Sequence, residues 1–225
     1  MTAETVLRVI DTETCDLQGG VVEIASVDVV NGQIINPMSH LVRPDRPISP
    51  QAMAIHRITE SMVANQPWIE EIIPQYYGSH WYVAHNASFD RRVLPEMPGE
   101  WICTMKLARR LWPGIKYSNM ALYKSRKLSV QTPAGLHHHR ALYDCYITAA
   151  LLIDIMKTSG WTPDQMATVT GRPALLTTFT FGKYRGKAVA EVAERDPGYL
   201  RWLYNNLDRM SPELRLTLKH YLDDH

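Results

Sequence analysis

Cysteine and long apolar runs are scarce in this sequence. Its 225 residues include three cysteines, Cys15, Cys103 and Cys145, without CxxC spacing. This argues against a disulfide framework or a zinc knuckle and predicts buried thiols. No window reaches the ~18 apolar residues of a membrane span, and the first ten residues lack a basic region followed by an apolar core. We therefore expect a cytoplasmic protein with no membrane contact.

Acidic residues are missing from one long stretch, Thr104 to Tyr143. A formal net charge of +1 does not by itself suggest a nucleic-acid partner, but this distribution leaves phosphate binding and a solvated face open as alternatives. The stretch contains eight cations: Lys106, Arg109, Arg110, Lys116, Lys124, Arg126, Lys127 and Arg140.

The order of predicted elements indicates an α/β protein with a mixed sheet and helices on both faces. Asn31-Gly32 separates two apolar runs and predicts a hairpin. The expected strands cover residues 6–10, 21–30, 33–42, 81–85 and 101–104. The expected helices cover residues 50–55, 60–64 and 68–77, one that begins at Phe89 with Ser88 as its cap, and a long one from near Arg140 to Gly160. The apolar face of that long helix is expected to contain Leu142, Cys145, Tyr146, Ala149, Leu152, Ile153 and Met156.

The chain is long enough for one domain with a small appendage. We expect a main domain over residues 1–158, a linker over 159–177 and a small C-terminal module over 178–225. In that module the sequence predicts a strand, a glycine-flanked basic turn and two helices, the second starting at Asp196-Pro197. Lys183, Arg185 and Lys187, interleaved with Tyr184, either hold phosphates beside a stacking ring or form a plain basic hairpin.

Four carboxylates could form a metal site. Asp11 and Glu13 are two residues apart on an expected strand, so both point to the same face. Taken alone, the pair also fits a turn with solvated acids. Asp90 at a helix start and Asp144 on the long helix supply two more hard oxygen ligands, enough for a pair of Mg²⁺ or Mn²⁺ ions.

Three consecutive histidines, His137 to His139, precede Asp144. Histidine titrates near neutrality and suits proton transfer, and nearby carboxylates should help it retain a proton. Residues five apart on a helix differ by about 140° around its axis, so His139 and Asp144 cannot share a helical face. We therefore place His139 on the preceding loop, and we expect His137 and His138 to be surface residues or phosphate contacts.

Three sequence motifs carry a family resemblance. "DTET", "NASFD" and His-x4-Asp resemble, in the same order, the motifs of the DnaQ-like 3′ to 5′ exonucleases in their histidine (DEDDh) branch. The resemblance implies an RNase H-like fold with a five-stranded sheet, here with a small α+β C-terminal module. It also implies that Asp11, Glu13, Asp90 and Asp144 bind two Mg²⁺ ions, for which Mn²⁺ can substitute, and that His139 is the general base. Arg140 stands where the sister branch has its tyrosine, which excludes the tyrosine mechanism.

The resemblance extends along the chain, including "FGKYRGK" and "DPGYLRWL". It implies removal of 5′-mononucleotides from DNA 3′ ends, single- or double-stranded, in DNA repair and mismatch excision. No obligate protein partner is evident from the sequence, and none is expected. Asp16 departs from the glycine that family members often have there.

The resemblance also suggests further substrate contacts, each with a structural alternative. Leu17 and Gln18 would pack against the terminal base, with Leu17 as a wedge at a duplex end or else as a core residue. His56 is either near the terminal nucleotide or a satisfied buried histidine, and Asn86 either touches the sugar or fixes its loop. Thr12 and Arg140 complete the substrate candidates.

Two rival functions stay open at this point. The same acids and histidine would serve an RNA-trimming enzyme, since nothing in the motifs reads a 2′-hydroxyl. A non-catalytic module that only binds DNA or a polymerase would be expected to have lost a metal-site residue, and this sequence retains all of them.

Overall fold

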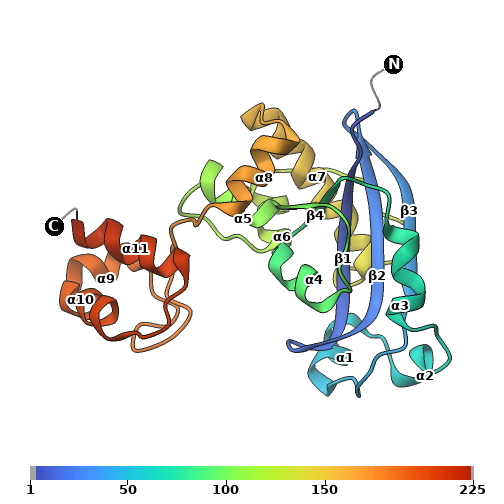
Figure 1. Ribbon diagram of the computed structural model, residues 1–225, viewed down its shortest axis with the longest axis horizontal. Coiled ribbons are helices and arrows are strands. Elements are labelled where there is room, and N and C mark those ends of the chain that lie inside the picture. Colours follow the sequence, from blue (N-terminus) through green and yellow to red (C-terminus); the bar gives the residue numbers. More distant parts are fainter. Residues whose placement is uncertain (1–3, 224–225) are drawn as a thin grey trace. The chain divides into compact units, whose positions relative to one another are not determined.

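A computed structural model describes residues 4–223 of the chain. Five strands form one sheet in the order β3-β2-β1-β4-β5. β1 (Leu7–Asp16), β2 (Gly19–Val30) and β3 (Gln33–Leu41) are antiparallel neighbours, and Figure 1 shows them running side by side. β4 (Trp81–Ala84) pairs in parallel with β1, and β5 (Glu100–Cys103) pairs in parallel with β4. The predicted mixed five-stranded sheet is confirmed.

β1 is longer than the sequence predicted. The expected strand ended at Ile10, but the ladder to β2 continues and pairs Asp11 with Ala25 and Glu13 with Glu23. The first two acids therefore lie within a hydrogen-bonded strand, which fixes their side chains more firmly than a strand-end turn would. The hairpin between β2 and β3 is confirmed, because Asn31 and Gly32 both have positive φ angles, as a two-residue turn of this kind requires.

Short helices follow the hairpin. They are α1 (Pro50–His56), α2 (Glu60–Val63), α3 (Ile69–Ile72) and the 3₁₀ turn η1 (Ile73–Tyr76). Ser49 caps α1, since its hydroxyl accepts a hydrogen bond from the Ala52 amide. α4 (Ala87–Val93) begins two residues earlier than predicted, so Ser88 lies inside the helix and Asn86, with φ of 66°, precedes it.

The long helix α7 (Ala141–Ser159) packs on β1, β2 and β3 and against α6 (Asn119–Ser125). Gly160 ends it with φ of 67°, as predicted. The predicted apolar face is partly wrong, because Leu142, Tyr146, Ile153 and Met156 are only half-buried. Contacts with both the sheet and α6 bury a wider arc, whose members are Ala141, Asp144, Cys145, Ile147, Thr148, Ala149, Leu151, Leu152 and Ile155.

A second core covers the opposite side of the sheet. Ile10, Ile24 and Tyr82 from the strands pack with side chains of α3, η1 and α4. Helices therefore lie on both faces of the sheet, as expected. Cys15, Cys103 and Cys145 are buried free thiols. Within residues 4–223, the helices are too short or too polar to cross a bilayer.

The chain divides into two compact units. One comprises residues 1–107 and 116–170, and the other comprises 108–115 and 171–225. α5 (Thr104–Leu111) contains residues of both. The segment expected to be a linker, residues 159–177, contains α8 (Pro163–Gly171), and the Thr170 hydroxyl of α8 accepts a hydrogen bond from the Cys103 amide in β5. Most of α8 thus belongs to the first unit, and the boundary lies near Gly171.

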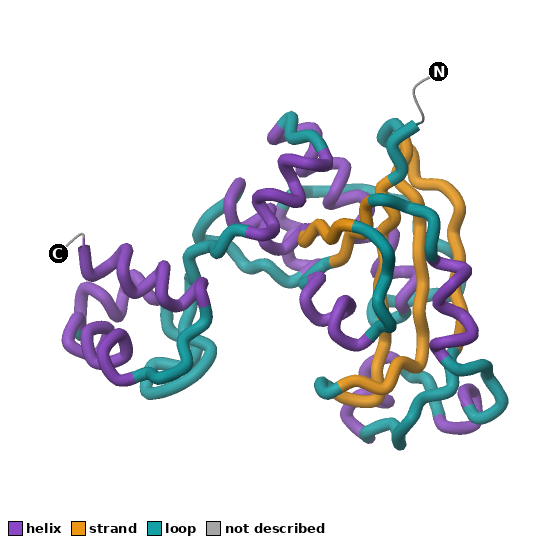
Figure 2. Tube along the Cα trace, in the orientation of Figure 1, coloured by secondary structure: helices purple, strands orange, loops and turns teal. Residues whose placement is uncertain are grey.

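The C-terminal unit is more helical than predicted. Figure 2 shows it as helices and loops, with α9 (Val189–Arg195), α10 (Pro197–Asn206) and α11 (Pro212–Asp223). The expected strand is reduced to one bridge between Thr178 and Ala188, and α11 was not predicted. The start of α10 is confirmed, because Asp196 accepts the Tyr199 amide and Pro197 follows it. The core of the C-terminal unit consists of Phe179, Val189, Val192, Ala193, Leu200, Leu203, Leu214 and Leu218.

Candidate active site

Carboxylates from distant parts of the chain meet at β1. Ligand atoms of Asp11, Glu13 and Asp144 all lie within 4.8 Å of one another. Asp11 and Glu13 share a face of β1 because they are two residues apart, and α7 packs on the sheet and brings Asp144 to them. The predicted convergence of the N-terminal pair with Asp144 is confirmed.

Asp90 reaches the site from the first turn of α4 and is 3% exposed. Its Oδ1 accepts a 2.9 Å hydrogen bond from the Thr12 hydroxyl, and its negative charge helps to raise the pKa of Asp11. Asp90 is not part of the tight group formed by the other three acids. Thr12, expected to touch substrate, therefore has a positioning contact with Asp90.

Burial and mutual repulsion make these acids reluctant to ionise together. Desolvation, followed by the charges of Asp90 and Asp144, raises the pKa of Asp11 well above its ordinary value. Desolvation, followed by the charges of Asp144 and Glu23, raises the pKa of Glu13 to about 9, and burial raises that of Asp90 to about 7. Clustered carboxylate oxygens are the ligands that Mg²⁺ prefers, and a divalent cation would relieve this repulsion, so the donor set fits the predicted metal site.

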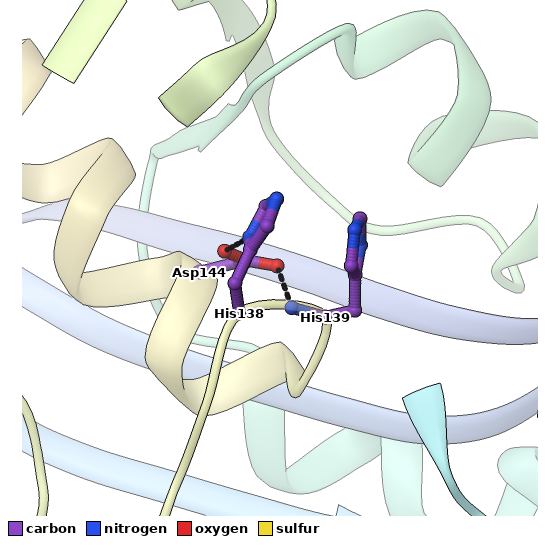
Figure 3. A group of neighbouring side chains, drawn as sticks. All are labelled: His138, His139 and Asp144. Atoms are coloured by element: carbon purple, nitrogen blue, oxygen red, sulfur yellow. Dashed lines mark hydrogen bonds and ion pairs between the residues drawn. The ribbon is translucent and has the colours of Figure 1, made fainter. Parts of the chain in front are cut away.

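The histidine tract is arranged differently from the sequence expectation. The His138 Nδ1 lies 2.7 Å from Asp144 Oδ1, and the His139 backbone amide donates to Asp144 Oδ2 at 2.9 Å. Figure 3 shows the two imidazoles side by side, with ring centroids 3.8 Å apart. His138 therefore touches Asp144 directly, a contact that the motif spacing did not indicate. The His137 Nδ1 lies 2.7 Å from the His138 carbonyl oxygen instead.

His139 lies on the loop before α7, as predicted, with an exposed side chain and a left-handed φ of 68°. Non-glycine residues rarely adopt this conformation, and such strain gathers at functional sites. The expectation that carboxylates would favour a protonated His139 is wrong in its net direction. Partial burial and the neighbouring His138 lower the pKa of His139, and the opposing effect of Asp144 is smaller. The unprotonated imidazole of His139 is thus favoured near neutral pH.

A cavity of about 690 Å³ opens beside Glu13. Apolar side chains from the β1–β2 turn and from α1 contribute to its lining, which includes Thr12, Leu17, Gln18, Ala52, Ile55 and His56. Leu17 is 82% exposed, which excludes the core-packing alternative. The cavity has room for a nucleotide-sized group next to the acids.

The turn that carries Leu17 is held from two sides. Asp16 Oδ1 accepts the amides of Gln18 and Gly19. The Arg92 guanidinium on α4 donates to the carbonyls of Leu17 and Gln18 at 2.9 and 3.0 Å. The aspartate that departs from the family pattern therefore stabilises this turn, and the exposed Leu17 is presented on a fixed backbone.

Two other candidates for substrate contact have structural partners. His56 is buried, and its Nδ1 accepts the Ile58 amide while Nε2 faces the Thr14 carbonyl at 3.3 Å. Both ring nitrogens are thus occupied, and burial lowers its pKa. Asn86 precedes α4 in a left-handed conformation and accepts a hydrogen bond from Ser88. Both observations support the structural alternatives, and substrate contacts for these residues stay predictions.

Comparison with known proteins gives a consistent result. The family model described as exonuclease matches residues 9–152, and one described as exodeoxyribonuclease X-like C-terminal matches residues 179–208. Exodeoxyribonuclease 10 of Escherichia coli strain K12 is 86% identical over 218 residues, which cover 97% of this chain and 99% of that protein. The chain belongs to this exonuclease family.

Solved structures of exonucleases have the same fold. A structure of exonuclease X in complex with 5′ overhanging duplex DNA is 87% identical and covers 73% of this chain and 99% of its own, with a TM-score of 0.73. The nuclease domain of 3′hExo, a DEDDh family member bound to rAMP, is 13% identical with a TM-score of 0.56, covering 70% and 94% of the two chains. The expected RNase H-like fold is thereby shown.

One buried acid of this exonuclease was missed from the sequence. Glu23 faces Glu13 across the β1–β2 ladder and is 2% exposed. Arg140 Nε and Nη2 donate to its carboxylate at 2.6 to 3.2 Å, and the Ala141 amide donates at 2.9 Å. The contact ties the start of α7 to β2, so Arg140 has a positioning role, and its expected substrate contact stays a prediction. An acid within the apolar run "VVEIASV" was the available signal.

Part of the cationic stretch in this exonuclease is used internally. The Arg126 guanidinium pairs with Asp154 at 2.8 Å, the Lys106 ammonium donates to the Thr170 carbonyl, and Arg140 pairs with Glu23. At least three of the eight cations thus have protein partners that compete with phosphate. The phosphate-binding alternative applies to fewer residues than the sequence suggested.

The acid cluster predicts how stability depends on pH when metal is removed. Since the pKa of Glu13 (about 9) and that of Asp90 (about 7) are raised, the folded state binds more protons than the unfolded state between pH ~4 and those values. Stability is therefore lost as pH rises. In EDTA, the melting temperature should fall from pH 7 to pH 9, and Mg²⁺ should restore most of the loss. A melting temperature that rises over this range in EDTA would contradict the raised pKa values.

Proposed function

We propose that this DEDDh exonuclease is a Mg²⁺-dependent 3′ to 5′ exodeoxyribonuclease. It would hydrolyse phosphodiester bonds at DNA 3′ ends, single- or double-stranded, and release 5′-mononucleotides. The observation that carries the proposal is the group of Asp11, Glu13 and Asp144 beside His139, in a chain 86% identical to an exodeoxyribonuclease. The structure of an 87% identical exonuclease with duplex DNA supports DNA as the substrate.

Each site residue has a role in this proposal. Asp11, Glu13, Asp90 and Asp144 would hold two Mg²⁺ ions, or Mn²⁺ in their place. Such ions, when bound, increase the acidity of a water and stabilise charge on the leaving oxygen. His139 would accept the proton of the attacking water, and its exposed loop position gives the imidazole access to solvent and substrate. His138 would orient Asp144 through the 2.7 Å contact.

Digestion of end-labelled oligomers tests the function directly. DNA and RNA of one sequence, single-stranded and duplex, are labelled at the 5′ or the 3′ end and incubated with Mg²⁺ or with EDTA. We expect 5′-labelled DNA to shorten stepwise, 3′-labelled DNA to release a labelled mononucleotide at once, and EDTA to stop both. Preferential RNA digestion would instead identify an RNA-trimming enzyme, and binding without digestion would identify a non-catalytic module.

Leu17 should matter for duplex ends more than for single strands. Its exposed side chain beside the active-site cavity is placed to enter between terminal bases. Because burying a leucine contributes roughly 1.5 to 3 kcal/mol, Leu17→Ala should slow digestion of blunt duplex about tenfold and leave single-strand digestion nearly unchanged. Initial rates on both substrates measure this. Ile35→Ala, an exposed apolar position on β3, is the control, and equal slowing on both substrates would argue against a wedge.

We place the activity in DNA repair and mismatch excision in the cytoplasm. A strain lacking the gene should show a raised mutation frequency that the wild-type chain restores and the Asp11→Asn variant does not. Unchanged mutation frequency would remove the repair role and leave the biochemical proposal intact.

A further inference from the structure

The C-terminal unit has an exposed aromatic surface beside a basic turn. Trp202 on α10 is 56% exposed, and Phe181 in the turn is 37% exposed. The turn, residues 181–187, contains Gly182 and Gly186 with positive φ angles and three exposed cations. We call Trp202 together with residues 181–187 the Trp202 surface. More than half of the Trp202 side chain stays exposed in the described chain, and exposed apolar groups beside charge are typical of binding sites.

Tyr199 joins the two parts of the Trp202 surface. Its ring is nearly parallel to that of Trp202, with an interplanar angle of 16° and centroids 6.2 Å apart. Its hydroxyl lies against Gly182, where a side chain would collide with it. Gly182, with φ of 70°, is therefore required both for the turn and for this close approach. The turn is fixed next to α10, and Tyr199 links it to the exposed indole.

The ring available for stacking differs from the one suggested by the sequence. Tyr184 is half-buried, its hydroxyl donates to Asp196 at 2.7 Å, and its ring meets Tyr199 edge-on. It supports the turn, and Trp202 is the ring whose face is accessible. Lys183 is also partly used, since it pairs with Asp196 at 3.1 Å. Arg185 and Lys187 are the exposed cations left for a ligand.

Charge selects the class of ligand. No Asp or Glu occurs from Gln165 to Ala190, so the turn presents positive charge without an acidic neighbour in sequence. A surface with cations and an accessible aromatic face matches a polyanion that has planar groups to stack. Single-stranded nucleic acid has both features, because its phosphates and its unpaired bases are accessible together.

We propose that the Trp202 surface is a second DNA-binding site, one that holds single-stranded DNA outside the active site. A base stacks on Trp202, and Arg185 and Lys187 contact neighbouring phosphates. The choice of DNA rests on the proposed function, whereas the class of ligand rests on the surface itself. Such a site would keep the substrate strand attached between successive cleavage events.

Binding by the full chain in EDTA tests the proposal without hydrolysis. The probe is a fluorescein-labelled oligothymidylate of about 20 nucleotides, and anisotropy gives the Kd. Stacking contributes about 1 to 3 kcal/mol per base, so Trp202→Leu should raise the Kd at least fivefold. Tyr204→Leu is the matched control, since Tyr204 is 38% exposed on the same helix but about 200° away around its axis.

A second variant does not depend on the indole. Arg185→Ala with Lys187→Ala, both in the exposed turn, should lower the slope of log Kd against log salt by about 1.4, because each phosphate contact on a single strand contributes ~0.7. Unchanged affinity and slope in both variants would overturn the proposal. So would a Trp202-dependent affinity for polyglutamate in place of DNA, which would indicate an acidic protein partner.

Hydrolysis separates this proposal from the proposed function. All three variants should cleave the p-nitrophenyl ester of thymidine 5′-monophosphate at the wild-type rate, since that substrate is too small to span two sites. On a long single strand, Trp202→Leu should release fewer nucleotides per binding event when unlabelled DNA is added as a trap. If neither the wild type nor any variant cleaves either substrate, the proposed function fails. The binding measurements in EDTA still test the second site independently.

Discussion

Replacing Asp11 by Asn is expected to abolish hydrolysis and to stabilise the metal-free protein. Asp11 lies in the group with Glu13 and Asp144, and burial with the charges of Asp90 and Asp144 raises its pKa. A bound metal ion lowers the activation free energy of hydrolysis by several kcal/mol, and each ~1.4 kcal/mol changes the rate tenfold. The rate should therefore fall about 10³-fold or more. The neutral amide also removes a buried charge that repels its neighbours, so the melting temperature in EDTA at pH 8 should rise.

The opposite signs of the two effects make the Asp11 test specific. A merely structural residue would lose activity and stability together. Asp164→Asn, at an exposed position in the first turn of α8, should change neither measurement appreciably. Retained activity in Asp11→Asn would remove Asp11 from the metal site. A lower melting temperature in EDTA would contradict the repulsion within the cluster.

His139→Ala should slow hydrolysis about 10² to 10⁴-fold, the usual contribution of a general base. His138→Ala should have a smaller effect, about 10- to 100-fold, because its contact with Asp144 orients a residue that we propose binds metal. Single-turnover rates with saturating Mg²⁺ measure the effects of both substitutions, and product release does not contribute to these rates.

His137→Ala is the matched control within the same tract. Its hydrogen bond is with the His138 carbonyl, and its effect on the pKa of His139 is the smallest of the causes, so the rate of this variant should stay near wild type. If His138→Ala were slower than His139→Ala, the base would have to be reassigned to His138, whose imidazole lies beside Asp144. The stacking of the two rings makes this comparison necessary.

Much of the site could be predicted because it depends on local geometry. Side chains two residues apart on a strand point to the same face, and this rule placed Asp11 beside Glu13. An angular difference of about 140° on a helix excluded a shared face for His139 and Asp144 and put His139 on the loop, where the structure has it. The hairpin at Asn31-Gly32 likewise follows from the φ angles that this pair accepts.

The same local rules were less accurate where packing extends an element. β1 continues through Asp16 because β2 supplies partners for its backbone, and no residue in "DTETCD" reveals that ladder. α7 is buried over a wider arc than a single apolar stripe because both the sheet and α6 contact it. The C-terminal strand was not formed beyond one bridge, since no neighbouring strand in the described unit pairs with it.

The amino-acid sequence by itself determined which chemistry this protein carries: four carboxylates and a histidine in an order and spacing that short-range geometry makes meaningful. Only the tertiary structure decided the partners of those groups. Four contacts join positions that are far apart in the chain or on different elements. They are Glu23 with Arg140, His138 with Asp144, Arg92 with the Leu17 turn, and Tyr199 with Gly182. Such contacts depend on how helices pack on the sheet and on each other, and periodicity along one segment contains no information about the residues that another segment will bring to it.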